Sequence, residues 1–97
     1  MKVKTKSGFE CEVPNGVLRD FRFIRARQAV KRSENEDDAQ QAALDMVSLV
    51  FCDPKEEERF LLHLADQNGR ALVEDVFREL WEIIAQVSEK DKKVKNS

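Results

Sequence analysis

The first thirteen residues alternate between apolar and polar positions, which is the period of a β-strand. Val3 and Thr5 fall on one side, and lysines occupy positions 2, 4 and 6 on the other. After Ser7-Gly8, a pair typical of tight turns, the alternation resumes with Phe9, Cys11 and Val13. We therefore expect a β-hairpin over residues 1–13. An isolated two-stranded ribbon is marginal in water, so its apolar face must pack on the rest of the chain or join a sheet in an oligomer.

Helical periodicity replaces the alternation after Pro14 and the turn pair Asn15-Gly16. A first helix is expected from about residue 20 to 32, with Asp20 as its N-cap. The second should run from about 37 to 51, with acidic residues at its positive end. Asp53 and Pro54 predict the start of a third helix, with Glu56 completing a capping-box-like arrangement. It should end before residue 67, and the fourth should run from about 72 to 88.

The apolar positions of these segments predict which helix faces are buried. The fourth segment has one broad apolar arc, formed by Val73, Val76, Phe77, Leu80, Trp81, Ile83, Ile84 and Val87. Its other side is polar and includes Asp75, Glu79, Glu82 and Gln86. The second segment has an alanine-rich face, which permits close approach of another helix. These features are typical of helices that share one small core.

The first helical segment carries apolar residues on two sides. Phe23, Ala26 and Val30 form one line, whereas Phe21 and Ile24 lie on nearly the opposite side. One line can face the core of so small a domain. We therefore expect Phe23, Ala26 and Val30 to be buried, and Phe21 and Ile24 to remain accessible.

Together these patterns predict a mainly α-helical (α+β) fold, with an N-terminal β-hairpin followed by about four helices in a small orthogonal or bundle-like domain. The domain should cover residues 1–88, with the hairpin at 1–13 and the helices within 20–88. Residues 89–97 are rich in charge and are expected to form a flexible tail. A chain of 97 residues suits a single domain.

The charge pattern bears on the class of partner. The segment 19–32 has six basic side chains and one acidic one, and the next segment is strongly acidic. A basic helix with aromatic residues can bind nucleic acid. The formal net charge of −2 favours a different interpretation, in which the two helices lie side by side and their charges complement each other. This pattern therefore argues against nucleic acid as the partner.

Candidate chemistry is sparse. Cys11 and Cys52 are far apart, His63 is the only histidine, and the three glycines are isolated. These spacings predict no catalytic residue, no cofactor-binding residue and no metal ligand. We accordingly expect a protein that is not an enzyme. No long apolar run predicts a membrane span, and residues 1–10 lack the apolar region of a signal peptide, so we expect a cytoplasmic location.

The order of the segments resembles the small tail assembly chaperones of long-tailed bacteriophages and prophages, especially those of Gram-positive hosts. The matching pieces are the ribbon "VKTKSGFECEV", the helix start "RDFRFIRA", the apolar run "LDMVSLVF", the stretch "ERFLLHLADQNGRALVEDVFRELWEII" and the basic end "KKVKNS". The resemblance covers nearly the whole chain. The arginine-rich first helix departs from it, because in this group that helix is often more acidic.

The resemblance implies a non-enzymatic protein that acts in the host cytoplasm and is absent from the mature virion. Such a protein would bind the tape measure protein, keep it soluble, and recruit major tail protein during assembly of the tail tube. Many members also have a longer form made by ribosomal frameshifting. Oligomerisation by self-association is a further possibility.

A protein-binding surface is expected at two places. One is the surplus apolar line of the first helix with its neighbouring arginines, at Phe21, Arg22, Ile24 and Arg25. The other is the hairpin, through Val3 and Phe9 and through a strand edge that can pair with another copy. The alternative function is a small nucleic-acid-binding regulator that uses the basic first helix.

Overall fold

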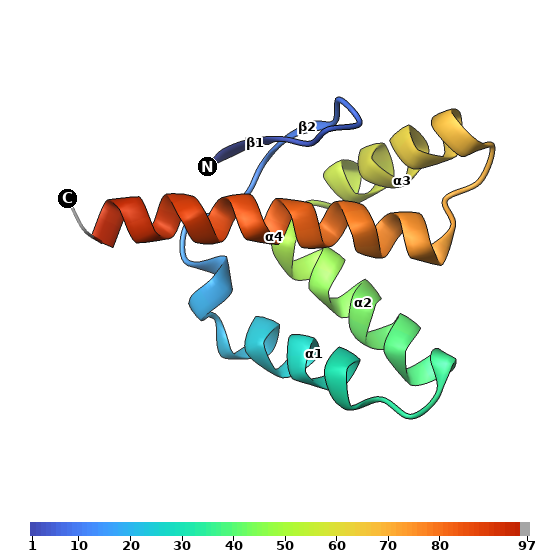
Figure 1. The fold of residues 1–97 in the computed structure, drawn as a ribbon, viewed down its shortest axis with the longest axis horizontal. Helices are drawn as coiled ribbons and strands as arrows, with labels where there is room; N and C mark the ends of the chain where they lie inside the picture. Colours follow the sequence, from blue (N-terminus) through green and yellow to red (C-terminus); the bar gives the residue numbers. More distant parts are fainter. Residues whose placement is uncertain (96–97) are drawn as a thin grey trace.

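The chain forms one hairpin and four helices in the predicted order (Figure 1). The computed structural model describes residues 1–95, leaving aside the side chains of 67, 68 and 92–95. The elements are β1 (Lys2–Lys4), β2 (Glu10–Glu12), a 3₁₀ turn η1 (Val17–Arg19), α1 (Phe21–Arg32), α2 (Glu36–Phe51), α3 (Pro54–Asn68) and α4 (Val73–Lys95). The mainly helical fold with an N-terminal hairpin is confirmed, whereas η1 was not predicted.

The hairpin is antiparallel and pairs Val3 with Cys11. Residues 6–8 form its loop, in which Gly8 adopts a φ of 93° that a side chain would strain. The expected alternation is confirmed, because one face of the ribbon is buried throughout: Val3, Thr5, Phe9, Cys11 and Val13. This face packs within the same chain, so the ribbon needs no second copy to cover it.

The outer edge of β1 is covered by side chains of α4, which runs alongside the hairpin (Figure 1). The Lys6 amide donates to Glu82 Oε1 at 2.8 Å, and Gln86 Nε2 donates to the Lys4 carbonyl at 2.8 Å. Lys90 Nζ donates to the Lys2 carbonyl. Four residues of a helix rise about 6.0 Å, and two residues of a strand rise about 6.6 Å. Side chains about one turn apart on α4 can therefore reach every second residue of β1. These contacts leave the β1 edge poorly placed to pair with another copy.

Three phenylalanines from different elements meet at the centre of the core. The ring of Phe9 lies 5.3 Å from that of Phe60 and 6.1 Å from that of Phe51, centroid to centroid. Phe51 and Phe60 are 5.1 Å apart. The cluster therefore joins β2 to the end of α2 and to α3.

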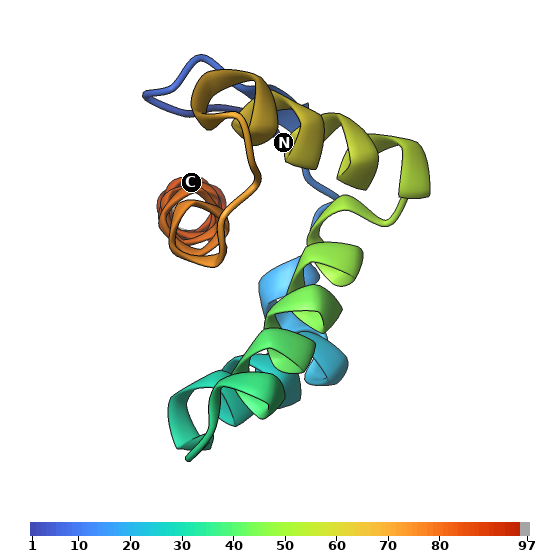
Figure 2. The same ribbon diagram turned by 90° about the vertical axis from the view of Figure 1, so that its right-hand side faces the viewer.

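The helices α1 and α2 pack side by side as a second hairpin (Figure 2). Small side chains permit the approach, since Ala26 of α1 and Ala42 of α2 are both buried. The predicted division of α1 is confirmed for Phe21, Phe23 and Ala26, whereas Val30, expected to be buried, is partly exposed. Phe23 is 0% exposed and Phe21 is 84% exposed, and Ile24 is partly exposed.

Two expectations about helix ends require correction. The fourth helix does not end near Ser88 but continues to Lys95, because 73–95 contains no Gly or Pro and Lys90 is held at the hairpin. The rest of the predicted tail, 96–97, lies outside the described residues. At the start of α3 the Asp53 side chain accepts from the Lys55 amide. Glu56 does not complete a capping box, because its carboxylate pairs with Arg59 at 2.7 Å.

The predicted polar side of α4 also requires correction. Glu79 is only 2% exposed and Asp75 only 8%. The hairpin loop lies against this side of the helix and covers Glu79. Within residues 1–95, no helix combines the length and apolar character needed to cross a bilayer.

The contrast between two phenylalanines on one helix gives a direct test of the packing. Phe23→Ala should lower the free energy of unfolding by about 3–5 kcal/mol, because it empties a fully buried site. Phe21→Ala should change it by less than about 0.5 kcal/mol, because that ring lies in solvent. Urea denaturation followed by circular dichroism measures both. Equal losses would contradict the orientation of α1.

The two cysteines test the burial of the hairpin. Burial raises the pKa of Cys11 to about 11 from 9.0, whereas Cys52 is exposed. In the native protein a thiol reagent should therefore label Cys52 rapidly and Cys11 only after denaturant is added. Between pH 9 and about 11 the unfolded chain loses the Cys11 proton while the folded chain keeps it. The free energy of unfolding of a Cys52→Ser variant should fall as pH rises through that window.

Candidate functional site

A polar cluster lies where the hairpin loop meets α3 and α4. Ser7 Oγ donates to Glu79 Oε1 at 2.5 Å and lies 3.0 Å from His63 Nε2. Thr5 Oγ1 is 3.0 Å from Ser7 Oγ and accepts from the Phe9 amide at 3.2 Å. One serine therefore links residues of three elements.

The hydrogen-bond directions decide what this cluster can do. A carboxylate only accepts, so the single hydroxyl hydrogen of Ser7 goes to Glu79, and His63 Nε2 must donate to Ser7. In an acyl-transfer triad the imidazole lies between serine and carboxylate and takes the serine proton. Here the serine lies between the other two groups. The arrangement satisfies a buried carboxylate and does not prepare a nucleophile.

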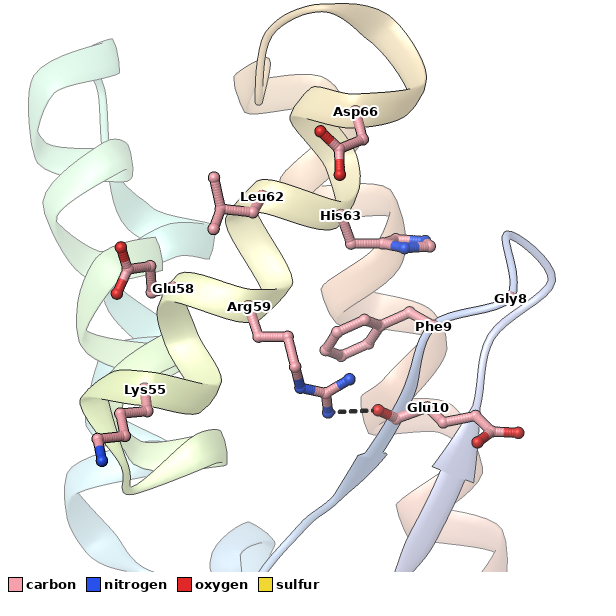
Figure 3. Close-up of a pocket in the computed structure, with 9 residues that line it drawn as sticks. All are labelled: Gly8, Phe9, Glu10, Lys55, Glu58, Arg59, Leu62, His63 and Asp66. Atoms are coloured by element: carbon pink, nitrogen blue, oxygen red, sulfur yellow. Dashed lines mark hydrogen bonds between the residues drawn. The ribbon is translucent and has the colours of Figure 1, made fainter.

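A shallow hollow of about 500 Å³ lies beside this cluster, between the hairpin and α3 (Figure 3). The Arg59 guanidinium lies 4.6 Å from the centroid of the Phe9 ring and donates to the Glu10 carbonyl at 2.5 Å. The Phe9 ring is 5.3 Å from the His63 ring on its other side. Hydrogen bonds from Arg59 also lower the pKa of Glu56. These side chains hold β2 against α3, which gives the hollow a structural role.

The sequence-predicted surface of α1 is present on the outside of the molecule. Phe21, Arg22 and Arg25 are exposed and Ile24 is partly exposed, all from the same half of α1. Arg22 bonds Asp20 with a 2.7 Å ion pair, which lowers the pKa of Asp20 to about 2. We call Phe21, Arg22, Ile24 and Arg25 the α1 surface.

The hairpin residues expected in the same role lie elsewhere. Val3 is 3% exposed and Phe9 is 2% exposed, both inside the core. Their side chains therefore hold the hairpin in place and are absent from the surface that a partner would meet. The expectation failed because α3, α4 and Phe51 at the end of α2 pack on the apolar face of the ribbon and bury it.

The expected charge pairing of the first two helices is not formed. Among the described residues no ion pair joins α1 to α2. The two helices lie side by side as expected, with buried alanines on both, and their charged side chains are exposed. The cations of η1 and α1 are exposed: Arg19, Arg22, Arg25, Arg27, Lys31 and Arg32.

An apolar groove of about 340 Å³ lies between α2, α3 and α4. Its apolar lining includes Leu44 and Val47 of α2, Leu61 of α3, and Val73 and Phe77 of α4, with Ala43, Ala71 and Val76. Leu44 is 56% exposed and Val73 is 43% exposed. We call this the α2–α4 groove. Three helices contribute apolar side chains to this groove, and it is open to solvent.

Sequence reasoning did not identify the groove. Leu44 falls outside the buried face of α2, and Val73 and Phe77 belong to the arc expected to be core. The available signal in the sequence was Leu44, an apolar residue outside the buried face of α2. Only the angles between the helices show that Leu44, Val73 and Phe77 converge on one groove. Within the described residues no group of three or more His, Cys, Asp or Glu side chains is placed to hold a metal ion.

The polar cluster generates a stability prediction. Ser7→Ala should lower the free energy of unfolding by about 1–3 kcal/mol, because it leaves buried polar atoms of Glu79 without their donor. Ser48→Ala is the matched control, since Ser48 is exposed on α2, and should change stability by less than about 0.5 kcal/mol. Urea denaturation measures both variants. A neutral Ser7→Ala would show that the cluster contributes nothing to the hairpin's attachment.

Comparison with known proteins adds no further assignment. No protein-family model, curated protein or solved structure matches this chain. The α1 surface and the α2–α4 groove are therefore the two features on which a function can be argued.

Proposed function

We propose that this protein is a non-enzymatic tail assembly chaperone that binds a helical, apolar segment of a tape measure protein. The observation that carries the proposal is the α2–α4 groove, an apolar surface left open on a small domain. The order of sequence segments that resembles these chaperones supports it independently. Recruitment of major tail protein and action in the host cytoplasm, outside the finished virion, belong to the same proposal.

The groove has the chemistry to bind one face of an amphipathic helix. Such helices bind through apolar side chains at positions i, i+3, i+4 and i+7. Leu44, Leu61 and Val73 come from three helices and converge on the groove. Gln40 and Glu57 at its border can meet the polar flanks of the same partner. An exposed apolar patch bordered by polar residues is the usual mark of a protein-binding site.

The modest size of the groove suits a chaperone that must later be displaced. A groove of about 340 Å³ accepts a few side chains, so one contact is weak. An elongated tape measure protein offers many similar segments, and several chaperone copies can cover it together. Weak single contacts then protect the apolar segments of the client and still allow exchange for major tail protein.

A nucleic-acid-binding regulator is the second candidate. The observation that favours it is the row of exposed cations on α1, which no ion pair joins to α2 in the described part of the chain. The exposed Phe21 and the partly exposed Ile24 among these cations favour a protein-binding surface as well. We place this candidate second, since the chain carries a net charge of −2.

Co-expression tests the chaperone proposal. The tape measure protein encoded near this gene should be found mainly in the soluble fraction when co-expressed with the wild-type chain. Leu44→Glu should reduce that soluble fraction several-fold, because it places a charge in the groove. Ala85→Glu, at an exposed position of α4 farther along the helix, should not.

Two results would contradict the proposal. One is a tape measure protein that stays insoluble with the wild-type chain although both are expressed. The other is equal rescue by the wild type and Leu44→Glu, which would remove the groove from the mechanism. Circular dichroism of the purified variants shows that each retains its helices.

A further inference from the structure

We infer that the α1 surface of one copy of this chain docks in the α2–α4 groove of a second copy, with Phe21 as the apolar anchor. The inference concerns the same groove as the proposed function, but it requires no client. It joins the two surface features that the fold leaves unused.

Phe21 has the character of an anchor that lacks its pocket. It is 84% exposed, the highest value among the large hydrophobic side chains of the described residues. Aromatic and arginine side chains supply most of the energy at protein interfaces. Phe21 lies next to Arg22 along α1, with Ile24 and Arg25 one turn away. The groove supplies the complementary apolar surface, through Leu44, Leu61 and Phe77.

A chain cannot fill its own groove with its own Phe21. Phe21 begins α1, at the end of the α1–α2 hairpin away from the loop that joins the two helices (Figure 1). The groove is lined on α2 by Gln40, Ala43, Leu44, Val47 and Ser48, which lie in the middle of that helix. Phe21 is 84% exposed in the folded chain, so its ring does not lie in the groove of its own chain. The occupant must therefore come from another molecule.

The charges of the two surfaces are complementary. Positions 21–32 contain four arginines and one lysine and no acidic residue. Glu57 lines the groove, and Glu74 is exposed on α4 next to Val73, which also lines it. Asp37 is exposed three residues before Gln40 and seven before Leu44, which places it on the same side of α2.

Fewer positive than negative side chains lie near the groove. Arg70 is exposed before α4, and Arg78 is held by Asp75 at 2.8 Å. The border of the groove is thus mainly acidic and attracts a basic helix. Such complementarity guides the orientation of two partners and makes their association sensitive to salt.

The contact joins unlike surfaces, which has consequences for assembly. Each copy offers one α1 surface and one groove, so repetition leads to a closed ring, a reciprocal pair or an open chain. A client helix and a second copy compete for the same groove. Self-docking would therefore cover the apolar groove when no client is present.

Complementation of two variants tests the inference. The wild type should show a weight-average mass above the monomer's 11.2 kDa that rises with protein concentration in light scattering or sedimentation at low salt. Phe21→Glu and Leu44→Glu should each weaken association by more than about tenfold, as expected for loss of an anchor. Mixed together, they retain one intact α1 surface and one intact groove. The mixture should form a 1:1 complex of twice the monomer mass that neither variant forms alone.

Controls make the outcomes decisive. Both positions are more than half exposed, so both variants should keep the wild-type melting curve, and Ala85→Glu should associate like the wild type. A wild type that remains monomeric, or a variant mixture that gives no complex, would overturn the inference. So would a higher mass that disappears on nuclease treatment, since nucleic acid would then be the ligand of the α1 surface. None of these results depends on the tape measure protein, so the chaperone proposal is tested separately.

Discussion

The burial of the hairpin's apolar face, centred on Phe9, is the interaction on which the rest of the structure depends. A two-stranded ribbon is not stable alone, and α3 and α4 have apolar faces that need a cover. Phe9 meets Phe51 and Phe60, so one side chain connects the ribbon to two helices. Burial of such a ring contributes about 1.5–3 kcal/mol, a large part of the stability of a small domain. The ribbon and the helices therefore stabilise each other.

Polar contacts fix the position of the hairpin on α4, whereas apolar contacts supply the free energy that holds it there. Hydrophobic burial has little directionality, whereas the bonds from α4 to Lys2, Lys4 and Lys6 set the register of helix against strand. Ser7 and Glu79 set the loop at the next turn of the same helix. A buried carboxylate is costly when its partners are lost, so this contact also disfavours a shifted hairpin. The register of the hairpin against α4 is thus specified by four residues, each about one turn from the next, along one side of α4.

Local patterns in the sequence were sufficient to predict the hairpin, the presence of four helices and much of the core. The alternation of residues 1–13 predicted the ribbon face, and the two lines of α1 predicted the opposite exposures of Phe21 and Phe23. Local patterns failed where distant segments meet. Glu79 belongs to the polar side of its own helix, and only the hairpin loop buries it. Leu44 and Val73 form a groove only through the angles between the helices. Val3 and Phe9 were expected to contact a partner, yet they are part of the core because helices pack on their face of the ribbon.

The geometry of α1 explains why the fold leaves two complementary surfaces. Residues two positions apart on a helix lie about 200° apart, so the packing that buries Phe23 turns Phe21 into solvent. The short link after α3, in which Gly69 takes a φ of 76°, starts α4 with Val73 still exposed beside Leu44. Phe21 at the start of α1 is exposed in the folded chain and does not cover the groove of its own chain. A fold of this kind favours contacts between molecules, with an elongated client or with further copies, and each contact can remain weak because it is repeated.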